Sequence, residues 1–295
     1  FFLILLVKFL SVALSYQFTK ISNLDKETKI LFFAIFTPVL ISMSHYNAPI
    51  NYSYFSYRDI YIILFLILFI ELFIYSRFRL FITILISLIA TISILFHVDI
   101  GFYINFLLIF YIFYLLVIKK YSEILLIFSS LIIFWSITIN LIGFDEFKAF
   151  LDHTKSIISS MDLIHGKKYP IPFFSISEPQ GDFGFGYGTR ATRGLLLQLA
   201  AGLFVLGYLI SDKRKIFSSK KVLFVFLFFL SFVMYKNALG RSDTAHLRMS
   251  ADLPILINCF FILNYLLIFL EKKIVIKQFL TQKIFFSLSI IFLII

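Results

Sequence analysis

The sequence predicts an all-α, polytopic integral membrane protein with about ten transmembrane helices and one long extracytoplasmic loop that contains an interfacial helix. Three observations predict this class. Of the 295 residues, 61% are hydrophobic and the mean hydropathy is +0.98, whereas soluble domains are about 45–50% apolar. The apolar residues form runs long enough to cross a bilayer, which takes about 20 residues. Lysine and arginine collect in every second loop between these runs, as they do in cytoplasmic loops.

Ten apolar runs meet this length criterion. Several are rich in Ile and Phe, but an open strand in lipid leaves backbone groups unpaired, so we expect helices. The runs divide the chain into six transmembrane helices in 1–142, an extracytoplasmic loop in 143–193, and four helices in 194–295 with an outer loop at 240–252. Because the chain begins without Met and ends inside the tenth run, we expect a fragment of a longer protein. The runs are Phe1–Phe18, Ile30–Tyr46, Ile60–Tyr75, Leu80–Phe96, Phe102–Ile118, Ile124–Ile142, Gly194–Ile210, Val222–Leu239, Leu253–Leu270 and the truncated Ile284–Ile295.

The charge pattern of the loops predicts which side of the membrane each loop faces. Five alternate loops hold sixteen of the 27 Lys and Arg residues, so we expect them in the cytoplasm and the first residue outside. The net charge of +11 then reflects topology and not nucleic-acid binding. The remaining loops are Asn47–Asp59, His97–Gly101, Gly143–Arg193 and Gly240–Asp252, and all five histidines lie in them or at their edges. Any chemistry is therefore expected on the outer face, away from cytosolic nucleotides, with donors that are carried in the membrane.

The long loop has two parts of different character. FDEFKAFLDHTKSIISSMDLIH has the apolar spacing of an amphipathic helix lying at the interface, with His165 on or beside its polar face. Beyond it, Tyr169 begins the stiff, extended stretch YPIPFF, and GDFGFGYGTR follows. This glycine-rich stretch is not a Walker loop or a dinucleotide fingerprint. It is either a re-entry loop or a loop that contacts a sugar or a lipid, and both interpretations stay open.

The densest charged cluster is GRSDTAHLRMSAD at 240–252, between two membrane runs, where charge usually marks a working site. If a helix starts after Ser242, Asp243 takes the N-cap and His246 the third position, close to Arg248. Arg241 and Arg248 would then hold a phosphate, while His246 or Asp243 takes or orients a proton. The alternative is a salt-bridge cluster that ties helix ends together.

Four further residues complete the candidate set. Arg190 and Arg193 lie where the long loop re-enters the bilayer, so they either capture a substrate phosphate or anchor the chain to lipid phosphates. Asp99, two residues after His97, is either a local cap or a catalytic carboxylate. Arg58 precedes Asp59 at the mouth of the third run and is either a phosphate ligand or half of a surface ion pair.

Cofactor signals in the sequence are weak. The single cysteine, Cys259, lies in an apolar run, which excludes a disulfide framework or a thiolate metal site within the chain. No metal-binding motif is present, although the Asp and His residues of the long loop are compatible with a divalent cation. We therefore expect no cofactor and no metal ligands.

The chain resembles bacterial envelope-glycan enzymes, namely GT-C type glycosyltransferases that use polyprenyl phosphate and the O-antigen polymerase and ligase type. The resemblance covers about residues 97–252 and includes the strings HGKKYPIPFF, ATRGLLL and ALGRSDTAH. It implies transfer of a sugar from a polyprenyl-phosphate-linked donor to a glycan or lipid acceptor at the outer face of the bacterial inner membrane. Arg241 and Arg248 would meet the donor phosphate, and Asp243 or His246 the acceptor hydroxyl.

Three alternatives remain open, one of which is a non-catalytic scaffold in an envelope complex. GT-C enzymes usually place a catalytic carboxylate in the first outer loop, and here only Asp59 and Asp99 stand in for it, so a polymerase or ligase fits the visible residues about as well. The alternative of another class is a transporter or a flippase for lipid-linked glycans. It requires ionisable residues or broken helices near the midplane, where the candidates are Lys8, Pro38, Glu71 and Lys236.

Overall fold

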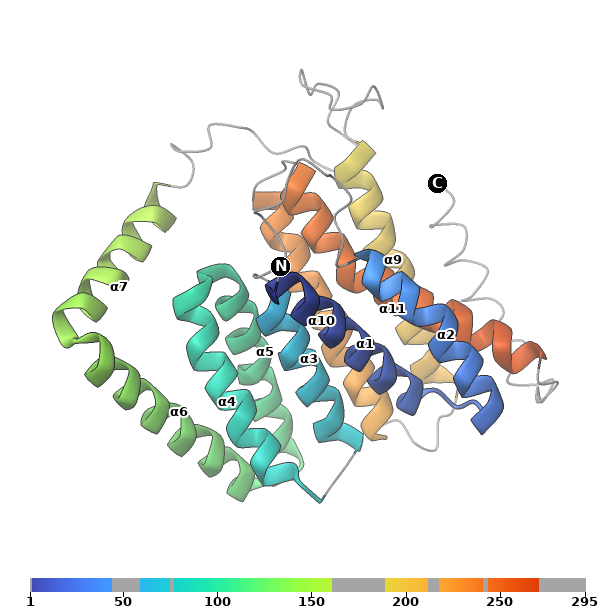
Figure 1. Cartoon of the computed structure of the whole chain (residues 1–295), viewed down its shortest axis with the longest axis horizontal. Helices are drawn as coiled ribbons and strands as arrows, with labels where there is room; N and C mark the ends of the chain where they lie inside the picture. The colour runs from blue at the N-terminus through green and yellow to red at the C-terminus, as the bar shows by residue number, and fades with distance from the viewer. Residues whose placement is uncertain are drawn as a thin grey trace. The chain divides into compact units, whose positions relative to one another are not determined.

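The computed structural model describes residues 2–43, 59–74, 77–160, 189–211, 218–240 and 244–270, and its regular structure there is entirely helical (Figure 1). Nine helices coincide with nine of the ten predicted membrane runs. The tenth run, Ile284–Ile295, lies outside the described residues. A further helix, α7, is the amphipathic helix expected at the start of the long loop. The bounds are α1 (Phe2–Ile21), α2 (Lys26–Met43), α3 (Asp59–Ile74), α4 (Arg79–Phe96), α5 (Val98–Val117), α6 (Tyr121–Ile142), α7 (Phe144–Ser159), α9 (Thr189–Ile210), α10 (Ser219–Gly240) and α11 (Thr244–Leu270).

Within the described residues, four helical segments are long and apolar enough to cross a membrane: α4, α5, α6 and the Ala251–Leu270 part of α11. Ile60–Ile74 and Gly194–Ile210 are apolar but shorter. The chain is therefore a helical membrane protein, and the ten-pass topology stays a prediction. The exposed side of α6 is strongly apolar, because only Glu123, Ile124, Ile127 and Ser130 of that helix are buried. Such a surface suits lipid as its solvent.

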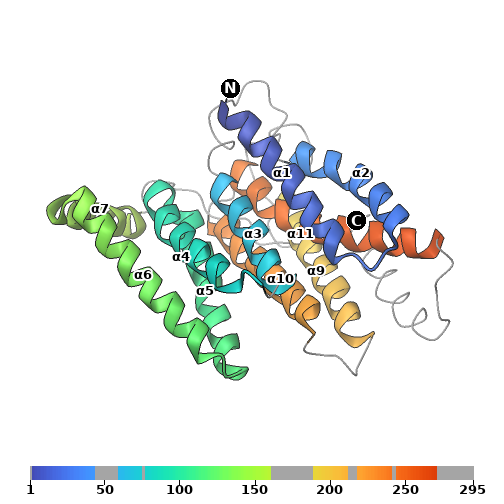
Figure 2. The same ribbon diagram turned by 60° about the horizontal axis from the view of Figure 1, so that its bottom comes forward.

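The chain divides into two compact units, one of Phe1–Leu14 with Ser44–Gly166, the other of Ser15–Met43 with Lys167–Ile295. In the first unit α3, α4 and α5 pack side by side and α6 packs against α4 and α5 (Figure 2). The hairpin of α4 and α5 has a single non-helical residue, His97. Asn105 holds the two helices together by donating from Nδ2 to the carbonyl oxygens of Ala90 and Gly101, both at 2.8 Å.

This hairpin corrects one prediction. His97–Gly101 was expected to be an outer loop, but Val98–Gly101 form the first turn of α5. Asp99 therefore lies in a helical first turn, where a carboxylate is favoured by the positive end of the helix dipole. The cap position itself belongs to His97, which makes no side-chain capping hydrogen bond.

A sharp corner joins α6 to α7. Gly143 sits at this corner with φ of 96°, a backbone conformation that glycine adopts without strain, and its N–H donates to the carbonyl oxygen of Ile139 at 2.9 Å. Phe147 of α7 packs back on Trp135 of α6, with ring centroids 5.6 Å apart. Asp145, Glu146, Asp152 and His153 are exposed, as the predicted amphipathic helix requires.

In the second unit α9, α10 and α11 pack on one another, and α2 packs on α11. Aromatic rings fill the core where α1, α2 and α11 meet: Phe18 lies 5.6 Å from both Phe36 and Phe260, measured between ring centroids. A polar contact ties α9 to α10, because Ser231 and Gln198 exchange hydrogen bonds of 2.7 and 3.1 Å. Because these buried polar groups hydrogen-bond to each other, their removal from solvent costs little free energy.

Candidate functional site

The predicted outer site falls largely on the first turns of α9 and α11. The helix expected after Ser242 is present and begins at Thr244, which places His246 and Arg248 in its first two turns. The helix α9 begins at Thr189, five residues before the predicted run, so Arg190 and Arg193 belong to its first turns and not to a loop. For these four residues the structure describes the backbone. Arg58, His165, Tyr169, Arg241 and Asp243 lie outside the described residues.

The helices α9 and α11 are neighbours that run in the same direction. Asn258 of α11 donates from Nδ2 to the carbonyl oxygen of Leu197 at 3.1 Å, and further along both helices Phe261 stacks on Phe204 with ring centroids 5.7 Å apart. Because residue numbers increase together along the contact, both N-terminal ends lie at the same end of the second unit. In Figure 1 both helices begin at the top of the view.

The position of each basic residue can be counted along its own helix from this contact, with Pro254 of α11 lying between Arg248 and Asn258. At 1.5 Å per residue, Arg190 lies about 10 Å and Arg248 about 15 Å beyond the Asn258–Leu197 contact, measured along the helix axes. The difference is about one helical turn. Each helix therefore has two basic residues in its first turns, where a helix N-terminus presents N–H groups and a partial positive charge. Such an arrangement is suited to binding an anion with more than one phosphate group.

Asp99 belongs to the first unit, in the first turn of α5, whereas the four residues on α9 and α11 belong to the second unit. Its side chain is partly exposed. Among the described residues no group of three or more His, Cys, Asp or Glu side chains is placed to hold a metal ion.

Sequence reasoning missed an ionic cluster in the first unit. The Nε of Arg79, at the start of α4, lies 2.6 Å from Oε1 of Glu123 in α6, and Glu123 keeps only 7% of its side chain exposed. The Nη2 of Arg79 donates to the Tyr111 hydroxyl at 3.0 Å, and that hydroxyl donates to Glu123 Oε2 at 3.3 Å. Lys120 adds a second cation 3.2 Å from Glu123. Each charge has its partners, so the cluster is suited to joining helices and not to binding a substrate.

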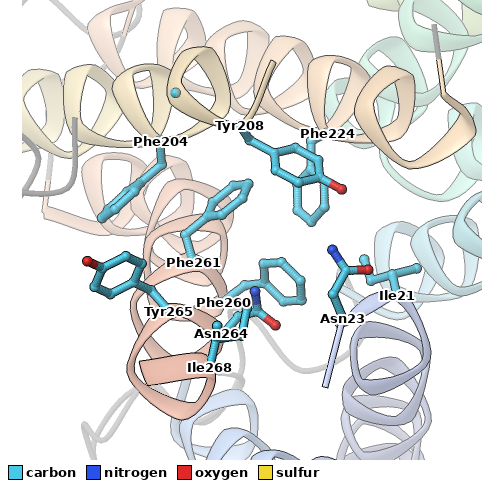
Figure 3. Close-up of a pocket in the computed structure, with 11 residues that line it drawn as sticks. Ile21, Asn23, Phe204, Tyr208, Phe224, Phe260, Phe261, Asn264, Tyr265 and Ile268 are labelled. Carbon is cyan, nitrogen blue, oxygen red and sulfur yellow. The ribbon is translucent and has the colours of Figure 1, made fainter. Parts of the chain in front are cut away.

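Sequence reasoning also missed a cavity in the second unit. It lies between the end of α1, the end of α9, the start of α10 and the second half of α11, and its volume is about 100 Å³. Figure 3 shows aromatic rings of α9, α10 and α11 and the side chains of Asn23 and Asn264 among the residues that line it. The predicted sidedness places this cavity at the cytoplasmic end of the helices, opposite to the N-terminal ends of α9 and α11.

Comparison with known proteins finds no match to this chain among family models, curated protein sequences or solved structures. The arrangement of its own residues therefore carries the functional conclusion.

Proposed function

We propose that this chain is a membrane-embedded glycosyltransferase that moves a sugar from a polyprenyl-phosphate-linked donor to an acceptor at the outer face of the bacterial inner membrane. One observation carries the proposal. Two parallel, contacting helices bring their N-terminal turns, with Arg190, Arg193, His246 and Arg248, to one end of the second unit. Guanidinium groups and helix N-termini both favour phosphate, and a histidine beside them supplies a proton acceptor.

The chemistry follows from these roles. The acceptor hydroxyl oxygen attacks the anomeric carbon of the donor sugar, and its proton passes to His246 or Asp243. The bond between the anomeric carbon and the phosphate oxygen breaks, and the polyprenyl phosphate or pyrophosphate leaves with the bonding electrons. Arg190, Arg193, Arg241 and Arg248 stabilise the negative charge that grows on this leaving group. The long donor chain stays in the bilayer beside the helices.

Predicted sidedness supports an outer-face donor. The loops between α1 and α2 and between α9 and α10 belong to the basic set, so the opposite ends of these helices face outward. The amphipathic α7 carries exposed acidic residues on one side and places Phe147 and Phe150 against one another with a centroid distance of 6.5 Å. A helix of this kind lies along a membrane surface and is suited to cover the acceptor.

A transfer assay tests the proposal. The purified protein in proteoliposomes receives lipid-linked glycan extracted from the source membranes together with the water-soluble acceptor fraction, and the product is followed by mass spectrometry. We expect Arg248→Ala to lower the transfer rate by about 100-fold, because an unshielded leaving-group charge costs several kcal/mol in the transition state. Arg248→Lys should keep part of the rate, since the charge remains but the planar fork is lost.

The matched control is Arg77→Ala, an exposed arginine in an expected cytoplasmic loop, which should keep the full rate. Product size separates the alternatives: a single added unit indicates a glycosyltransferase or a ligase, and a ladder of units indicates a polymerase. Movement of the lipid-linked glycan between leaflets without any covalent product would contradict the proposal and favour a flippase.

A further inference from the structure

The helix α6 is buried on one side only. It lies at the edge of the first unit, where it packs on α4 and α5 (Figure 1). Only 17% of its apolar span is buried, compared with 39% for α4 and 44% for α5. With 22 residues, α6 is about 33 Å long, which matches the hydrocarbon core of a bilayer. Its other side therefore faces either lipid or another membrane helix.

A line of polar side chains runs along the centre of this exposed side. Ser122, Ser129 and Ser136 follow one another at intervals of seven residues, Asn140 lies one turn beyond Ser136, and all four are exposed. Ser136 is nine residues from the fully buried Ile127, which places the two on opposite sides of the helix. We name these four residues the α6 stripe. Small and polar residues in membrane helices are enriched where helices pack, because lipid tails offer no hydrogen bonds.

Two other helices bury comparable lines of hydroxyl side chains. These residues are Thr83, Ser87, Thr91 and Ser93 on α4, and Ser11, Ser15, Thr19 and Ser22 on α1. The Ser87 Oγ donates to the Thr83 carbonyl oxygen of its own helix at 3.0 Å, so it is satisfied without the neighbouring helix. Such a line gives the neighbour a shallow surface that it can approach closely. The α6 stripe is a surface of the same kind, and yet it is exposed.

We propose that a second copy of this chain covers the α6 stripe, so that two α6 helices pack against each other in the membrane. Copies that insert with the same orientation are related by a twofold axis along the membrane normal. This axis makes the two helices parallel and brings each stripe residue close to its own counterpart. Ser129 and Ser136 then face the same serines of the second copy, and a seven-residue interval is the repeat of a parallel helix pair. The interface is independent of the proposed transferase site.

The chemistry of the stripe suits contact between identical surfaces. The Nδ2 of Asn140 donates to the Ser136 carbonyl oxygen at 2.8 Å, which uses one of its two N–H groups. The second N–H and the Oδ1 atom can therefore bond to an identical amide, as a single Asn does at the interface of a coiled coil. Two copies would not repel each other here, because the one charged residue of α6, Glu123, lies on the packed side with Arg79.

The exposed side of α6 is large enough for a specific dimer. A strip about 33 Å long and half the circumference of a helix of about 10 Å diameter has an area of about 500 Å². Two copies would bury about 1,000 Å² in total, which is the size expected of a specific interface. Large side chains border the serines, since Leu125 is 69% and Ile132 65% exposed. Small residues between large ones allow two helices to interlock.

Oxidative crosslinking in native membranes tests the proposal. In a Cys259→Ala background, Ser129→Cys and Ser136→Cys each place one thiol on the stripe. The controls are Phe128→Cys, on α6 about 100° from Ser129, and Phe110→Cys on α5, both at exposed positions. With copper phenanthroline we expect the two serine variants to shift from 34.5 kDa to twice that mass on a non-reducing gel, and the controls to stay at 34.5 kDa.

Two results would overturn the proposal. Serine variants that keep the single-chain mass would show that lipid or another segment of this chain covers the stripe, and a crosslink of a different mass would indicate another protein. Controls that crosslink as strongly as the serine variants would show random collisions in the membrane.

A second measurement separates the serines from the amide. Single-molecule photobleaching in liposomes gives the fraction of dimer as the ratio of lipid to protein rises. We expect Asn140→Leu to weaken the dimer about tenfold, the effect of one or two hydrogen bonds between membrane helices. The double variant Ser129→Ile, Ser136→Ile should abolish it, because large side chains keep the backbones apart. Phe128→Ile is the matched control and should leave the dimer unchanged. An unchanged dimer in the double variant would contradict the proposed packing.

Discussion

At the scale of single residues, two charged side chains of this protein, Glu123 and Lys220, have different surroundings. In the first unit Glu123 is surrounded by Arg79, Tyr111 and Lys120, which together satisfy a carboxylate that is almost fully buried. In the second unit Lys220 has a neutral amide and another lysine nearby. Removing one member of a buried ion pair is costly, because it leaves the other charge without its partner. The first group is therefore suited to holding its helices together.

The Glu123 cluster makes a direct prediction about stability. Glu123→Gln should lower the free energy of unfolding by about 3–5 kcal/mol, because it leaves the Arg79 guanidinium in a partly buried position without its counter-charge. Tyr111→Phe should cost only about 1 kcal/mol, since it removes one neutral partner. Titration with denaturing detergent, followed by circular dichroism, measures both. Glu146→Gln on the exposed side of α7 is the control. A Glu123→Gln protein as stable as that control would show that the cluster is dispensable.

At the scale of elements, close contacts between helices depend on glycine. A Cβ at Gly101 would overlap the backbone Cα of Ile94, so α4 and α5 can approach this closely only because residue 101 has no side chain. At Gly202 of α9 a Cβ would meet the Cζ of Phe228 at 2.9 Å, which is the far end of a side chain that can turn aside. Backbone cannot move in this way without separating the helices.

Two alanine substitutions therefore should differ in effect. We expect Gly101→Ala to destabilise the protein by about 1–3 kcal/mol or more, because it forces α4 and α5 apart and weakens the Asn105 hydrogen bonds. Gly202→Ala should cost less than half as much. The midpoints of thermal unfolding of the two variants and of the unmodified protein, all measured in one detergent, test this difference. If Gly202→Ala is the more destabilising of the two, the prediction that α4 and α5 depend on a glycine at residue 101 is wrong.

Most elements could be predicted from the sequence, and the errors have physical causes. Apolar run length located nine helices, because a bilayer imposes a fixed length. The start of α5 was missed since Asp99 was taken as a loop residue, although a carboxylate in a first turn is favoured by the helix dipole. The start of α9 was missed for a related reason: Arg190 and Arg193 were taken as loop charges, yet they occupy helical positions.

The candidate sites were less predictable than the helices. The GRSDTAHLRMSAD cluster was visible because its residues are close in sequence and stand out between apolar runs. The Arg79–Glu123 pair and the cavity around Asn264 gave no such signal. Their members come from separate helices, and each residue taken alone looks like an ordinary loop charge or an ordinary core side chain. Only the packing of distant helices brings them together.

At the scale of the whole molecule, the proposed function depends on sidedness. The transferase proposal needs the N-terminal ends of α9 and α11 at the outer surface, where lipid-linked donors are presented. This orientation is predicted from the accumulation of lysine and arginine in alternate loops. Reversal of the topology would remove the transferase proposal.

Thiol labelling in intact cells is the measurement that tests this sidedness most directly. In a Cys259→Ala background, Thr244→Cys marks the start of α11 and Ser219→Cys marks the start of α10. A membrane-impermeant maleimide should label residue 244 in intact cells and residue 219 only after permeabilisation. Labelling of residue 219 but not residue 244 in intact cells would contradict the account, because the arginines and histidine proposed to act on an outer-leaflet donor would then face the cytoplasm.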